Sequence, residues 1–251
     1  MACTNDDRQN ETLKVDNFTK IGELHNNFLT NIKDNIKPLT VNQNNEKKID
    51  YINFYNLNYT SNEIMNVVNK SSLIKSLNGT KRFIKTTNLT DELFDIEKND
   101  GSFNIFEIIQ ELKNQNTFGD FGSNFMNDFA INLKHNFNGN LSDSDYKQTV
   151  LLSIEKYNNH NYSSNSKEGV LIGQILSISI HSIEWWEQNP DAIENKLLPW
   201  VAADIGGAIA GGLGSVLSNW WNDEDVDWSD AAAWAVGGAV GASTGTWLAT
   251  L

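Results

Sequence analysis

The residue types that most often carry chemistry are sparse along this chain of 251 residues. The histidines are His25, His135, His160 and His181, and none has a second histidine at the helical spacing of a zinc site. The one G-x-S-x-G run, residues 241–245, falls inside a predicted helix rather than in a strand-to-helix turn, and no glycine-rich loop precedes a Lys-Ser or Lys-Thr pair. These absences predict a protein that is not an enzyme, holds no cofactor and has no metal site.

His25 allows two interpretations. It lies beside Asn26 on a predicted amphipathic helix, where it is either a ligand-contacting or catalytic residue, or a hydrogen-bonded histidine near a helix boundary. We favour the second, because no partner stands at a catalytic spacing. His181 falls within a strongly apolar segment, which predicts a neutral core histidine.

Two acidic runs have some of the spacing of calcium loops. Residues 95–101 with Glu107 follow part of the EF-hand pattern, but Ile96 occupies the first ligand position. In residues 223–229, acidic side chains alternate toward Ser229, but Trp228 stands where the turn glycine belongs. We expect both runs to be solvated acidic turns.

The overall charge excludes one class of partner. Lys and Arg number 19 against 32 Asp and Glu, a net charge of −13, whereas nucleic-acid binding needs a basic surface. A single cysteine excludes a disulfide framework and a cysteine-based zinc site. The length suits one large domain or two small ones.

Apolar side chains at spacings of three and four predict an all-α fold. Such stripes run through residues 17–36, 64–77, 103–112 and 125–137, and Asp143 or Ser144 is the expected N-cap of a further helix. Residues 167–188 are apolar nearly all round, which predicts a central core helix that Pro190 ends. We divide the chain into a tether at 1–14, a helical bundle at 15–190 and a helical hairpin at 191–251.

The third region has a distinct composition. All eight tryptophans lie from Trp185 onward, and Gly and Ala dominate after Pro190. Small residues recur at every fourth position, forming a glycine zipper along one face of each of two predicted helices. The expected packing residues are Ala203, Gly207, Gly211, Ser215, Ala233, Gly237, Gly241 and Gly245.

The two segments, 197–218 and 230–251, are joined by a short connection and predict an antiparallel hairpin about 30 Å long. Tryptophans stand near the segment ends, where a membrane interface would favour them: Trp200, Trp220, Trp221, Trp228 and Trp247. Asp204 argues against a membrane span, because a charge at mid-membrane costs about 2.5–3.5 kcal/mol. Three arrangements remain open: a transmembrane hairpin, a hairpin packed on the bundle, and a hairpin that inserts conditionally.

The start of the chain points to the cell envelope. Cys3 follows Ala2 and precedes a polar stretch, which resembles the mature start of a bacterial lipoprotein. That resemblance implies acylation of Cys3 and a lipid-anchored, periplasmic or surface-facing location. The alternative is an exposed cysteine in a disordered N-terminus. Short patterns at residues 21–26 and 182–189 are similar to those of uncharacterised bacterial lipoproteins.

The hairpin resembles the glycine-zipper segments of membrane-active bacterial peptides and two-helix bacteriocin-like toxins. We therefore weigh two functions. The first is a non-enzymatic lipid-anchored envelope protein whose hairpin mediates close helix packing, self-association or membrane association. The second is a bacteriocin-like toxin that inserts the hairpin into a target bilayer and carries it on a helical domain. The expected partners are a membrane, through Cys3 and the hairpin, and a second copy of the chain.

Overall fold

A computed structural model of the chain gives the positions of most of the predicted helices. It describes residues 12–40, 105–137, 142–190, 198–221, 231–232, 234–240 and 242. Within these ranges the fold is all-α, which confirms the predicted class, and the β contact found there is an isolated antiparallel bridge between Thr12 and Ser163. The predicted stripe at 64–77 lies outside the described residues.

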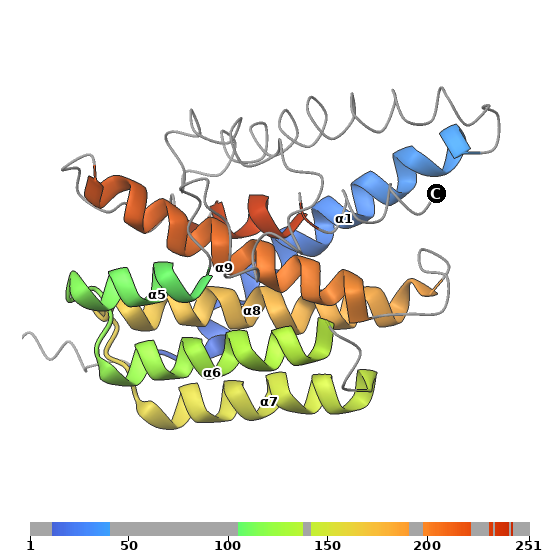
Figure 1. Ribbon diagram of the computed structural model, residues 1–251. Helices are drawn as coiled ribbons and strands as arrows, with labels where there is room; N and C mark the ends of the chain where they lie inside the picture. Colours follow the sequence, from blue (N-terminus) through green and yellow to red (C-terminus); the bar gives the residue numbers. More distant parts are fainter. Residues whose placement is uncertain are drawn as a thin grey trace, which may run out of the picture.

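The helices surround a central one (Figure 1). Their bounds are η1 (Val15–Phe18), α1 (Thr19–Thr40), α5 (Ile105–Asn114), α6 (Asp120–Phe137), α7 (Asp143–His160), α8 (Lys167–Gln188) and α9 (Leu198–Trp221). Helix α8 contacts α1, α6, α7, α9 and η1. Figure 1 shows α9 along one side of α8 and α7 along the opposite side, and α6 contacts α7, α8 and α9. Residues 234–240 form a further helical segment.

Local sequence sets the ends of α7 and α8. The N-cap of α7 is Ser142, whose Oγ accepts a hydrogen bond from the backbone N–H of Asp145 at 3.3 Å. The prediction of Asp143 or Ser144 was therefore wrong, because these residues already belong to the first turn. The predicted bounds of α8 are confirmed: Ser166 caps the helix, and it ends at Asn189, immediately before proline.

Helix α8 is the core helix that its composition predicts. Apolar side chains are buried around most of its circumference, and they share one hydrophobic cluster with side chains of α9 such as Val201, Ile205 and Ile209. Side chains before and after Pro190 belong to one hydrophobic cluster. The structure therefore does not separate two domains there, and the predicted boundary near Pro190 stays a prediction.

The start of the described chain is tied to the connection between α7 and α8. The backbone N–H of Leu13 donates to the carbonyl oxygen of Tyr162 at 2.7 Å. The ammonium of Lys14 donates to the carbonyl oxygen of Asn158 at 2.5 Å, at the last turn of α7. These bonds fix the place at which the chain enters the fold.

Candidate functional site

Helix α9 and residues 234–240 meet through their backbones. A methyl group added to Gly207 would overlap the carbonyl oxygen of Gly238, and one added to Gly238 would overlap the carbonyl oxygen of Gly207. One turn further along α9, Gly211 lies against the carbonyl oxygen of Trp234. The residue numbers of the contacting positions rise along α9 as they fall along 234–240, so the two helices run antiparallel. No side chain larger than hydrogen fits at these positions.

The predicted packing residues can be placed in part. Ala203, Gly207, Gly211 and Ser215 are all buried on α9. In the second helix Gly237 is buried, but the residue that meets Gly207 is its neighbour Gly238. Ala233, Gly241 and Gly245 lie outside the described residues, so their role stays a prediction.

The spacing of Trp234, Gly238 and Ala242 also repeats every four residues. This second row makes Gly238 as eligible a contact residue as Gly237, and only the packing against Gly207 selects between them.

Most of the other predicted site residues lie outside the described residues or have side chains that are not described. Trp200, Trp220 and Trp221 belong to α9, but their side chains are not described. Cys3, Trp228, Trp247 and residues 95–101 and 223–229 lie outside the described residues, whereas Glu107 lies exposed in the first turn of α5. Among the described residues, no helix combines the length and the hydropathy needed to cross a bilayer.

Asp204 is the one charged side chain of α9, and it is fully buried. Its Oδ2 accepts a hydrogen bond from Ser182 Oγ at 2.7 Å and another from Trp186 Nε1 at 2.6 Å, both from α8. Its Oδ1 lies 3.2 Å from Nε2 of His25, which is also fully buried. That last contact is an ion pair by distance and falls outside hydrogen-bond geometry. Asp204 thus joins three helices.

His25 lies in the interior of α1, so the expectation of a histidine near a helix boundary was wrong. Its Nδ1 lies 3.0 Å from Oδ1 of Asn26, and the amide of Asn26 donates to the carbonyl oxygen of His181 at 2.9 Å. Helix α1 can approach α8 this closely because Gly22 has no side chain; a methyl group there would overlap the ring of His181. His181 itself is half-buried, with Nδ1 2.8 Å from the carbonyl oxygen of Ser177.

The cluster does not have the geometry of a hydrolytic triad. Ser182 donates to Asp204 and not to His25, so the histidine is not placed to activate the hydroxyl. Tyr146 of α7 adds a buried hydroxyl that has no hydrogen-bond partner among the described residues. Burial raises the pKa of Tyr146 well above its ordinary value, and the charge of Asp204 raises it further. The arrangement places two ionisable side chains and a tyrosine hydroxyl inside the core.

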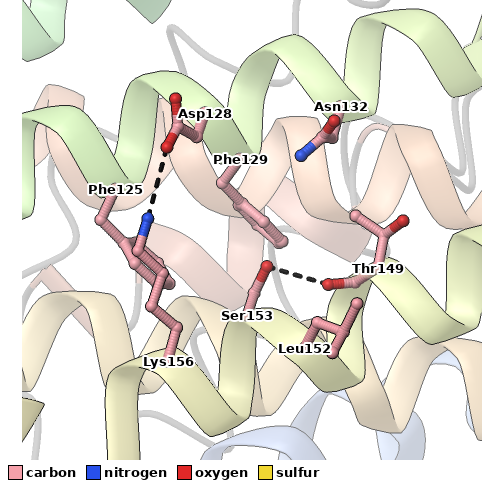
Figure 2. A pocket seen from close by; sticks show the side chains of 8 residues that line it. All are labelled: Phe125, Asp128, Phe129, Asn132, Thr149, Leu152, Ser153 and Lys156. Carbon is pink, nitrogen blue, oxygen red and sulfur yellow. Dashed lines mark hydrogen bonds and ion pairs between the residues drawn. The ribbon is translucent and has the colours of Figure 1, made fainter. Parts of the chain in front are cut away.

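A second candidate is a shallow groove of about 280 Å³ between α6 and α7 (Figure 2). Its lining residues are Phe125, Asp128, Phe129, Asn132, Thr149, Leu152, Ser153 and Lys156.

Figure 2 shows Lys156 of α7 reaching Asp128 of α6, with 3.3 Å between Nζ and Oδ2. The hydroxyl of Ser153 donates to the carbonyl oxygen of Thr149 on its own helix, and Leu152 is 54% exposed. The groove is an open surface feature, and one ion pair joins its two helices.

No protein-family model, curated protein or solved structure matches this chain. Function therefore rests on the residues themselves.

Sequence reasoning missed the pairing of His25 with Asp204, because nothing local connects the two positions. One signal was available. A lone carboxylate in an apolar helix needs a partner when the helix is buried, and the few histidines were the natural candidates.

Proposed function

We propose that this chain is a non-enzymatic, lipid-anchored protein of the bacterial cell envelope whose glycine-zipper hairpin holds helices in close packing. The observation that supports the packing role is the backbone approach of Gly207 and Gly238. Contact at this range adds dispersion attraction and weak Cα–H···O bonding along the helix pair. It also offsets the unfavourable helix propensity of glycine, about 1 kcal/mol per residue relative to alanine.

The envelope location is supported by the first residues. A small residue, a single cysteine and a polar stretch follow one another at Ala2, Cys3 and residues 4–14. The described chain begins at Thr12 and enters the fold beside the α7–α8 connection. A tether before that point agrees with attachment to a membrane at Cys3.

Metabolic labelling tests the anchor. The chain is expressed in a bacterial host behind a lipoprotein export signal, in the presence of an alkyne-bearing fatty acid. We expect the wild type to be labelled and to fractionate with membranes, and Cys3→Ser to be exported without label. An exported, folded wild type that carries no label would contradict the lipid anchor.

A second function, insertion of the hairpin into a target bilayer, is favoured by the low charge of α9, in which Asp204 is the one charged residue. Insertion would have to break the contact between Asp204 and His25 within the protein. Mixing Cys3→Ser protein with dye-loaded liposomes separates the two functions. The packing role predicts that no dye is released, whereas release by folded protein would favour the inserting toxin.

A further inference from the structure

We propose that His25 and Asp204 together bind a single proton, and that this proton locks α9 into the bundle. Both side chains are fully buried, and they join α1 to α9 across the core. The inference concerns the folded chain alone and does not depend on a lipid anchor or on membrane insertion.

The neighbouring amide of Asn26 determines which ring nitrogen of His25 carries a hydrogen. Asn26 Nδ2 donates to the carbonyl oxygen of His181, so Asn26 Oδ1 is the atom that faces His25 Nδ1, at 3.0 Å. An amide oxygen only accepts hydrogen bonds. His25 Nδ1 therefore carries a hydrogen, and a neutral ring would present a bare lone pair at Nε2.

His25 Nε2 lies 3.2 Å from Asp204 Oδ1. A bare lone pair facing a carboxylate oxygen in a buried site is repulsive, and it would leave an unbalanced charge in the core. One additional proton removes both problems, whether it resides on the ring or on the carboxyl group. Asp204 Oδ2 already accepts from Ser182 and Trp186, whereas Oδ1 and His25 Nε2 are buried with no hydrogen-bond partner among the described residues, so the additional proton belongs on one of these two atoms. The pair then has no net charge.

The surroundings offer no other balancing charge among the described residues. Helix α8 brings the neutral donors Ser182 and Trp186, while its His181 bonds back to its own helix. Helix α7 brings the hydroxyl of Tyr146, which stays neutral because its pKa is raised. The charged side chains described on α5 and α6 lie at exposed or half-buried positions.

The proton count fixes how stability depends on pH. An unfolded chain loses an aspartate proton near pH 3.9 and a histidine proton near pH 6.5. On these two residues the unfolded chain therefore holds two protons below about pH 3.9, one proton between about pH 3.9 and 6.5, and none above. The folded pair, as proposed, holds one. Stability rises with pH where the unfolded state binds more protons, and falls where it binds fewer.

Asp204→Asn tests this inference in the full chain. The asparagine oxygen still accepts from Ser182 and Trp186, and its amide can donate to the bare Nε2 of His25, so the folded variant needs no additional proton. Above about pH 4, the folding equilibrium constant of the variant divided by that of wild type should rise about tenfold per pH unit. Urea unfolding followed by circular dichroism at pH 5, 6, 7 and 8 measures the ratio. Asp128→Asn, in the exposed pair with Lys156, is the matched control and should show a flat ratio.

A flat ratio for Asp204→Asn between pH 5 and 8 would overturn the inference. Should that variant not fold, the side-chain ¹⁵N spectrum of the wild-type histidines at pH 8 shows which ring nitrogens carry a hydrogen. The His25 signal is assigned by its loss in His25→Gln. The expected result is a hydrogen on Nδ1 together with an Nε2 that carries a hydrogen or accepts one from Asp204. An Nε2 with the signal of a nitrogen that neither carries nor accepts a hydrogen, or a ring whose one hydrogen sits on Nε2, would be contrary to it.

Discussion

The two sides of α8 pack through different kinds of contact. On one side α9 packs against α8 with a buried charge, and it meets the helix at 234–240 through bare backbone. On the other side α7 packs through side chains, and its ion pairs lie at the surface. The ammonium of Lys147 lies 2.6 Å from Glu187, with the two side chains 35% and 41% exposed.

This difference predicts where the protein tolerates change. An exposed ion pair contributes about 0–1 kcal/mol, because water solvates either partner when the other is removed. A buried charge that loses its partners has no such alternative. The α9 side is therefore expected to be intolerant of single-atom changes, and the α7 side permissive.

Removing a carboxylate from each side gives the largest expected contrast. Asp204→Ala leaves the donors of Ser182 and Trp186 without an acceptor and His25 without its ion pair, so we expect a loss of about 3–5 kcal/mol in the free energy of unfolding. Asp128→Ala should lose less than about 1 kcal/mol. Urea unfolding at pH 6 measures both. Similar losses in the two variants would remove the distinction between the sides.

A glycine series sharpens the contrast within α9. In Gly207→Ala and Gly211→Ala the new methyl group meets backbone that cannot rotate away, and we expect each to lose about 1–3 kcal/mol. Gly212→Ala is the matched control on the same helix, because its methyl group meets the side chains of Leu171 and Ala235 at 3.1 and 3.3 Å. The gain in helix propensity should leave that variant near wild type. Thermal melts rank the three, and equal losses would argue against backbone contact.

The smallest expected effects come from two tyrosines of α7. Tyr157 donates to the carbonyl oxygen of Gly169 at 2.8 Å, so Tyr157→Phe should lose about 1 kcal/mol. The buried hydroxyl of Tyr146 has no such partner among the described residues, so Tyr146→Phe should be close to neutral at pH 7.

The same two residues predict an alkaline effect. Burial raises both pKa values, so above pH 10 the unfolded state ionises first, binds fewer protons, and stability falls as pH rises. Tyr146→Phe should flatten this fall by up to about 1.4 kcal/mol per pH unit. Urea unfolding at pH 10 and 11 measures the change, and an unaltered slope would contradict the burial of that hydroxyl.

Periodicity in the sequence predicted what depends on one helix at a time. The all-α class and the bounds of α8 follow from apolar spacing and from Pro190 after the end, whereas the N-cap Ser166 came from the structure. The small-residue rows likewise pointed to an antiparallel hairpin.

Contacts between distant helices were not predictable in the same way. Rotating a helix by one residue position exchanges Gly237 for Gly238, and only the packing against Gly207 selects between them. The pair of His25 and Asp204 depends on where α1 crosses α9, which no local pattern encodes.

The bonds that fix the start of the described chain also determine how it transmits force. A pull on the residues before Thr12 acts first on the bridge to Ser163 and the bond from Leu13 to Tyr162. The load then passes to the last turn of α7 through Lys14. Because α9 is not part of this path, tension at the N-terminus would strain the α7–α8 corner before it reached the hairpin.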